Sequence, residues 1–233
     1  MKNKSFSFKK LALGLLSIII YFLIPNVLLL NCNRYIPVTN KNLAYYNLIL
    51  YFITLIIFII IYRELIINNF KDFINNYKKY LPKAFSYWIK GFILMIASNY
   101  ILNFILKIGQ SSNELQNIAL IKENLLVHSI TIIFIAPILE EIAFRLSFHK
   151  MTNNKHIFAI ITGTIFGFVH IISSLDPSKL QYLLLLIPYA SMGIALGYTY
   201  KETDNIFSSL AMHMFHNTLT LIIIIIGIKG GII

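Results

Sequence analysis

Seven long apolar runs constrain the fold of this chain more than any other feature. They lie at about 10–30, 43–63, 85–106, 124–145, 156–174, 180–200 and 206–228. A helix needs roughly 20 apolar residues to cross the hydrocarbon core of a bilayer, so each run is long enough to span it. Within a bilayer only helices and closed barrels satisfy every backbone hydrogen bond. We therefore predict an all-α, polytopic membrane bundle of about seven transmembrane helices.

Composition supports a membrane protein and argues against a nucleic-acid-binding one. Hydrophobic residues make up 58% of the chain and charged residues 12%, whereas about a quarter of a soluble domain is charged. The formal net charge of +11 comes from short basic clusters between apolar runs, not from one basic folded surface. We expect the lipid bilayer as a partner and no nucleic acid. Cys32 is the single cysteine, which excludes an intrachain disulfide.

The distribution of basic residues predicts an orientation. Lys2, Lys4, Lys9 and Lys10 precede the first apolar run, which is too long for a signal peptide and is followed by no small-x-small cleavage site. With the N-terminus in the cytoplasm, inside segments hold fourteen of the 20 Lys and Arg residues and outside segments hold six. The positive-inside rule then predicts a multi-pass cell-membrane protein with a cytoplasmic N-terminus. The longest linker, 64–84, contains aromatic and basic residues that suit an interfacial helix, with a polar loop as the alternative.

Three ionisable residues stand where an apolar run ends. Glu141 and Arg145 are four residues apart and share a helical face, so the arginine can neutralise that glutamate. Glu140 points about 100° away and lacks this partner, which leaves it free to act on something else. The alternative is that all three mark a helix end among lipid headgroups. Charge in hydrocarbon is costly, so a functional role competes with that alternative.

Two later apolar runs also contain polar side chains: His170 in one, and His213, His216 and Asn217 in the other. At 1.5 Å per residue, Glu140, His170 and His213 lie at depths of roughly 15, 22 and 12 Å. Such depths fit one buried polar chamber, although each histidine taken alone fits a hydrogen-bonded packing residue. His128, His149 and His156 lie near the ends of runs, where we expect solvated or interfacial roles. The patterns GTIFG (163–167) and GIALG (193–197) predict close helix packing in the same region.

A carboxylate and two imidazoles around a wet pocket can activate water. The carboxylate of Glu140 would be the general base, and Asn217 would donate a hydrogen bond to the oxyanion of a tetrahedral intermediate. Glu140, His170 and His213 can equally bind a divalent metal such as Zn²⁺, and the sequence does not choose between the two. We expect no other cofactor. The chain lacks an HExxH helix and a suitably placed GxSxG elbow.

These motifs resemble those of the CPBP intramembrane proteases, also called the CAAX-protease or Abi family. The family pattern of EExxxR, FxxxH and HxxxN appears here as Glu140–Arg145, Phe166–His170 and His213–Asn217, in order and on separate runs. The resemblance covers about a third of the chain, from Pro137 to Asn217. It implies a metalloprotease-like endopeptidase that hydrolyses peptide bonds at the membrane. Glu140 would activate water, His170 and His213 would position it or bind metal, Asn217 would stabilise the oxyanion, and Glu141–Arg145 would hold the helix.

The resemblance divides the chain into two parts and leaves the substrate open. Residues 1–123 carry no recognised motif, and 124–228 form the predicted catalytic core. A prenylated tail, a leader peptide and a bacteriocin-like peptide are the substrates left open. Within the third motif, His216 is an alternative to His213 for the role given to that histidine. One alternative is a non-catalytic bacteriocin self-immunity or scaffold protein on the same fold. A proton-coupled transporter is less favoured, because no inverted repeat with broken helices is visible.

Overall fold

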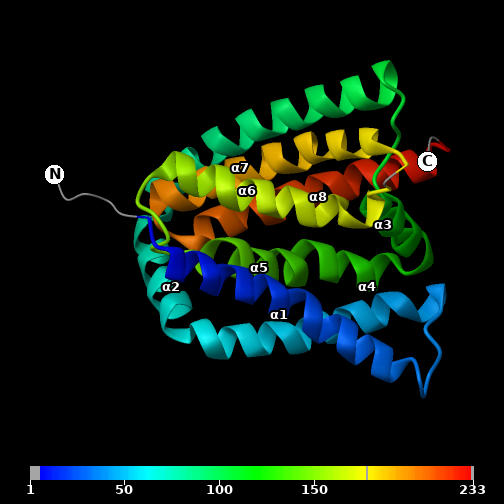
Figure 1. The fold of residues 1–233 in the computed structure, drawn as a ribbon, viewed down its shortest axis with the longest axis horizontal. Coiled ribbons are helices and arrows are strands. Elements are labelled where there is room, and N and C mark those ends of the chain that lie inside the picture. The colour runs from blue at the N-terminus through cyan, green and yellow to red at the C-terminus, as the bar shows by residue number, and fades with distance from the viewer. Residues whose placement is uncertain (1–5, 177, 232–233) are drawn as a thin grey trace.

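The computed structural model describes residues 6–176 and 178–231, which fold into a bundle of membrane-length helices with no strand among them (Figure 1). Lys2 and Lys4, which enter the charge count above, lie outside the described residues. The α-helices are α1 (Phe8–Cys32), α2 (Asn40–Tyr100), α3 (Ser112–Glu123), α4 (Leu125–Ile130), α5 (Ala136–Glu141), α6 (Lys155–Ile171), α7 (Leu186–Thr203) and α8 (Ile206–Lys229). Short π-helical segments follow α2, α4 and α5 at Ile101–Ile105, Thr131–Ile135 and Ile142–Leu146. Segments of 3-10 helix lie at Ile172–Ser174 and Leu180–Leu185.

Six of these helical stretches are long and apolar enough to cross a membrane, against seven predicted runs. The difference lies in α2 and the π-helical segment after it, which form one continuous stretch, Lys41–Ile105, over the predicted span 43–63, the linker, and nearly all of the predicted span 85–106. Figure 1 shows α2 running along one edge of the bundle, turning midway at the end of the bundle where α1 begins, and returning along the opposite edge. The linker 64–84 is therefore helical throughout, and the alternative of a polar loop is wrong.

The turn of α2 is fastened to the start of α8 by buried polar groups. Asn205 is fully buried, and its side-chain amide donates to the Asn69 carbonyl oxygen and to Asp72 Oδ2, each at 2.7 Å. The side-chain oxygen of Asn69 in turn accepts from the backbone N–H of Ile206 at 2.8 Å. Asn205 also caps α8 by accepting from Phe207 N at 2.9 Å. This cluster fixes where α8 begins and therefore how far along the bundle its histidines lie.

Helices α6 and α7 pack with almost no space between their backbones. A Cβ added at Gly163 would lie 2.3 Å from the backbone nitrogen of Ile194, and one at Gly193 would lie 2.6 Å from the Gly163 carbonyl oxygen. In lipid there is little hydrophobic force between helices, so such close packing is a main source of helix association. The close contact predicted from the two glycine patterns is confirmed.

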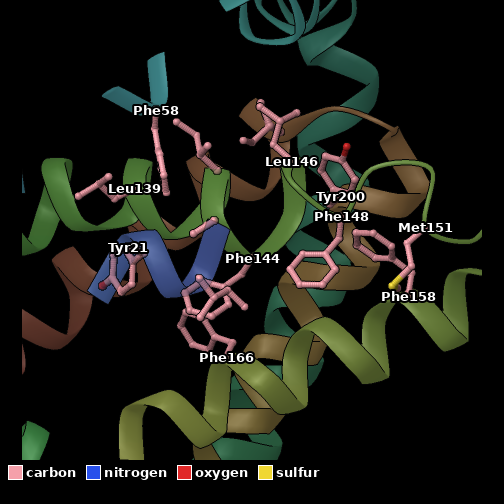
Figure 2. Close-up of a cluster of buried hydrophobic side chains, with 14 of the residues drawn as sticks. Tyr21, Phe58, Leu139, Phe144, Leu146, Phe148, Met151, Phe158, Phe166 and Tyr200 are labelled. Atoms are coloured by element: carbon pink, nitrogen blue, oxygen red, sulfur yellow. The ribbon is translucent and has the colours of Figure 1, made fainter. Parts of the chain in front are cut away.

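The largest buried cluster joins the N-terminal helices to the motif-bearing segments. Figure 2 shows Tyr21 of α1 beside Phe144 and Phe166, with Phe58 of α2 on the other side of the 136–146 segment. The Tyr21 and Phe144 rings meet edge to face at 5.9 Å, and Phe144 meets Phe166 in the same way at 5.5 Å. Such aromatic pairs add directional contacts to simple packing. The segment that bears the acidic motif is thus held from both sides.

Candidate active site

A proline shapes the helix that carries the two glutamates. In the π-helical turn before α5, the backbone N–H of Ala136 bonds to the Thr131 carbonyl oxygen, five residues back. The next bond in that register would come from residue 137, which is a proline and has no N–H to give. The Ile132 carbonyl oxygen is therefore freed, and the side-chain amide of Asn217 donates to it at 2.7 Å. Asn217 thereby ties α8 to the π-helical segment before α5, and it satisfies a backbone carbonyl group that lipid cannot hydrogen-bond.

The predicted pair of Glu141 and Arg145 is present and fully buried. Arg145 Nε lies 3.8 Å from Glu141 Oε2, with both side chains at 0% exposure. The Arg145 guanidinium also donates to the Gly193 carbonyl oxygen at 3.1 Å, and its centre lies 4.8 Å from the centre of the Phe166 ring. Removing charge from water is expensive, so a buried arginine needs these partners together. The pair links the 136–146 segment to both α6 and α7.

His213 lies between the two adjacent glutamates. Its Nδ1 is 2.9 Å from Glu141 Oε1, and its Nε2 is 3.5 Å from Glu140 Oε2. The contact with Glu141 is new, since the sequence paired that residue with Arg145 alone. A carboxylate at Nδ1 fixes the imidazole orientation and leaves Nε2 facing the reactive side.

Glu140 has a second partner that the sequence did not predict. The hydroxyl of Tyr21, on α1, donates to Glu140 Oε1 at 3.2 Å. The sequence predicts only that Glu140 lacks the arginine partner of Glu141, and a distant helix provides a different partner across 119 residues of sequence. The only signal in the sequence was a tyrosine inside an apolar run, and its neighbour in space cannot be read from spacing. Tyr51 of α2 lies on the same wall of the site.

His170 is held by a hydrogen bond from one of its ring nitrogens to the backbone of its own helix. Its Nδ1 is 2.9 Å from the Phe166 carbonyl oxygen, which can only accept, so Nδ1 carries the proton and Nε2 is the free acceptor in the neutral ring. The ring of Tyr189 stacks on the His170 ring at 5.3 Å between centroids. Phe166 lies against both histidines, with centroids 4.2 Å from His170 and 5.7 Å from His213. This phenylalanine acts as the shared packing surface of the site.

A cavity of about 350 Å³ brings the predicted residues together. Its wall includes Glu140, His170, His213, His216 and Asn217, whereas Glu141 and Arg145 lie behind that wall. The polar chamber expected from the helix depths is thus present.

The peripheral histidines divide between the cavity and the surface. His128 also lines the cavity, at only 3% exposure, so its expected solvated role is wrong. Its Nε2 lies 3.1 Å from the Asn117 side-chain oxygen. His156 contacts the Tyr198 hydroxyl at an exposed position, as expected.

Glu140, His170 and His213 were also expected to be able to hold a metal. Both histidines have Nδ1 engaged and Nε2 available, which is the donor chemistry that a divalent cation requires. Among the described residues, however, no three His, Cys, Asp or Glu side chains lie close enough to form a ligand set. The side chains are thus not gathered into a ligand set, so we derive no step through a metal, and the ligand role of Glu140, His170 and His213 stays a prediction.

Two comparisons with known proteins point to the same class. Residues 122–219 match the family model described as "Rce1-like: Type II CAAX prenyl endopeptidase Rce1-like". The chain is also 29% identical over 141 residues to the "Putative membrane peptidase YdiL" of Bacillus subtilis (strain 168), an alignment that covers 58% of this chain and 54% of that relative. The chain thus spans about half the length of the curated relative that it matches. No solved structure gives a significant match.

Proposed function

We propose that this chain is an intramembrane endopeptidase of the CPBP family, supported by the match of residues 122–219 to the Rce1-like endopeptidase model and by the similarity to a putative membrane peptidase. Its reaction would be hydrolysis of a peptide bond in a membrane-associated protein or peptide. The observation that carries the proposal is the position of His213, held between Glu140 and Glu141 on the wall of the chamber. Paired acid and base groups in a cavity of this kind mark a functional site by default.

The charges of the buried cluster support this proposal. Glu140 and Glu141 bring two negative charges, and Arg145 brings one positive charge. His213 contacts both carboxylates, so each charged group of the buried cluster has a partner, as burial of charge requires. The proposed reaction uses Glu140 in its ionised form, as a general base requires.

In the proposed reaction, Glu140 takes a proton from a water molecule as the water oxygen bonds to the carbonyl carbon of the substrate. The carbonyl oxygen becomes an oxyanion, and the second N–H of the Asn217 amide can donate to it while the first stays on Ile132. As the C–N bond breaks, Glu140 returns the proton to the departing amine. Nε2 of His170 would accept a hydrogen bond from the water and so orient it. Glu141 and Arg145 would act as positioning residues, through His213 and the helix.

The ligand role of Glu140, His170 and His213 toward Zn²⁺ is a separate proposal with its own test. Metal content of the purified protein would be measured for the unmodified chain and for His170→Ala. Stoichiometric metal that is lost in His170→Ala, together with sensitivity to a chelator, would establish the ligand role. A metal-free protein that still cleaves would remove it.

The function itself is tested by cleavage of quenched, lipidated peptides by the purified protein. The library would contain prenylated tails, leader peptides and bacteriocin-like peptides, because each of these substrates is proposed on equal grounds. Glu140→Ala, His170→Ala and His213→Ala should abolish cleavage, and Glu64→Gln, at an exposed site on α2, should not.

Other readouts separate the remaining explanations. A scaffold or immunity protein would keep its cellular function in all three alanine variants, whereas a proton transporter would show flux in proteoliposomes without cleavage. The orientation with a cytoplasmic N-terminus, proposed from the basic residues, would be checked by labelling cysteines introduced at each end.

A further inference from the structure

The charge on the chamber wall is opposite in sign to that of the chain. The chain has 20 Lys and Arg residues against nine Asp and Glu. Of the described residues that line the chamber, none is a lysine or an arginine, and two, Glu114 and Glu140, are carboxylates. A substrate group with a negative charge would therefore find no lysine or arginine side chain there.

Glu114 is the carboxylate that the proposed reaction does not use. It lies in the first turn of α3, outside the six candidate membrane spans and at the end of the bundle where the chain also ends (Figure 1). Within the described residues its side chain takes part in one hydrogen bond, from Gln110 Nε2 to Glu114 Oε1 at 3.0 Å, and in no ion pair. Burial raises the pKa of the Glu114 carboxyl, as expected for an acid removed from water without a cation beside it.

Contacts at its N-terminal end hold helix α3 in place relative to His170. Ser111, which caps α3, lies 2.6 Å from the Tyr189 hydroxyl, and the Tyr189 ring stacks on His170. The backbone N–H of Ser112 donates to Ser174 Oγ at 2.7 Å, which pins the same end of α3 to the segment after α6. Glu114 therefore holds a set position relative to His170.

The chamber wall that includes Glu114 is rich in side-chain amides, which donate and accept equally well. They come from α2, the following π-helical segment and α3, and include Asn99, Asn103, Asn113, Gln116 and Asn117. An extended peptide presents the same alternation of N–H and C=O groups. This part of the wall suits a peptide backbone, while the carboxylate provides one charged contact.

We infer that this end of the chamber is a subsite for a lysine or arginine side chain of the peptide substrate, with Glu114 as its partner. The inference rests on the proposed function, because only a peptidase would cut the bound peptide. It names the substrate class as a peptide with a basic residue near the bond that is cut. A free terminal carboxylate is not what this subsite recognises. Glu114 is then a specificity-determining residue.

The test is equilibrium binding of fluorescent peptides in neutral detergent, which does not depend on hydrolysis. The peptides share an apolar ten-residue sequence in which one position at a time carries lysine or its uncharged counterpart norleucine, each with an amidated or free C-terminus. The protein is the full chain with Glu140→Gln, so that bound peptides stay intact and the other carboxylate cannot compete. Glu114→Gln is added to this background, and Glu123→Gln, an exposed position on the same helix, is the matched control.

We expect lysine at the favoured position to tighten binding by about tenfold over norleucine, as for a charged hydrogen bond in a partly buried site. Glu114→Gln should remove that preference and leave norleucine binding unchanged, which also shows that the variant is folded. Equal affinity for the two peptides, a preference that survives Glu114→Gln, or tighter binding of the free carboxylate would each overturn the inference. If lysine peptides bind as expected but the unmodified protein cuts none of them, the subsite stands and the proposed function fails.

Discussion

The segment that carries the acidic motif and the first helix differ in how protein surrounds them. In the most apolar 18-residue stretch of Leu125–Leu146, 44% of the residues are buried, whereas in the corresponding stretch of α1 28% are buried. All five residues of the π-helical segment Ile142–Leu146 are buried, so protein encloses it on every side. In α1 the buried positions follow one face, at Gly14, Ser17, Ile18, Tyr21 and Pro25. The motif segment is the centre of the bundle, whereas α1 is a one-sided wall whose other face is apolar and exposed.

This contrast shows what each region contributes to the site. Charge is tolerable at the centre because neighbouring helices supply the partners for Glu141 and Arg145. The wall has no ionisable motif, yet it places the hydroxyl of Tyr21 on Glu140. The division at residue 124 therefore describes where the motifs lie, and it stays a prediction as a domain boundary. The main core cluster includes residues from both sides of it.

The largest effect should come from the carboxylate at the centre. Glu140→Gln keeps the shape of the side chain but removes the base, and we expect kcat/KM for peptide cleavage to fall by about 10³-fold. Glu64→Gln, at an exposed position on the wall helix α2, should change it by less than twofold. Activity within tenfold of the unmodified protein in Glu140→Gln would show that the centre has another base.

The next effect tests whether the centre depends on its buried cation. Arg145→Met leaves the Glu141 carboxylate buried without its ion pair, and we expect a loss of about 3 kcal/mol in stability. Thermal unfolding in detergent, followed by size-exclusion chromatography, would measure it. Arg63→Met, at an exposed position, is the control. Adding Glu141→Gln to Arg145→Met should recover part of the loss, and a double variant that is worse than either single one would contradict the pairing.

A smaller effect tests the packing of α6 against α7, the helix whose Gly193 carbonyl oxygen accepts a hydrogen bond from Arg145. In Gly163→Ala the new Cβ would meet the Ile194 backbone, 2.3 Å from its nitrogen, so α6 and α7 must separate. We expect a loss of about 2 kcal/mol in the same unfolding assay. Thr164→Ala, at the neighbouring exposed position, should be close to neutral. Equal stability of the two variants would mean that α6 and α7 pack less closely than described.

The sequence predicts features set by local spacing and misses those set by distant parts of the chain. Each apolar run became helix because run length and bilayer thickness decide it. The Glu141–Arg145 pair was predictable because residues four apart share a face. The continuity of α2 through its polar linker was missed, since polar residues also favour helix when the rest of the bundle supports them.

The contacts of Asn217 and Glu140 could not be read from spacing at all. The amide of Asn217 donates to the Ile132 carbonyl oxygen, which lies 85 residues earlier in the chain and is left free by Pro137, and only the folded bundle brings the two together. Tyr21 reaches Glu140 in the same way, from a helix without any motif.

The smallest effect would show whether the wall takes part in function or only encloses the centre. Tyr21→Phe removes one hydroxyl and keeps the ring contact with Phe144. Losing one hydrogen bond to a carboxylate corresponds to about 1 kcal/mol, so we expect kcat/KM to fall about fivefold with stability nearly unchanged. Tyr45→Phe, on an exposed tyrosine of α2, is the matched control and should have no effect. If both variants behave like the unmodified protein, the hydroxyl does not tune Glu140 and α1 serves the site by packing alone. A fivefold loss confined to Tyr21→Phe would make the region without motifs part of the catalytic apparatus.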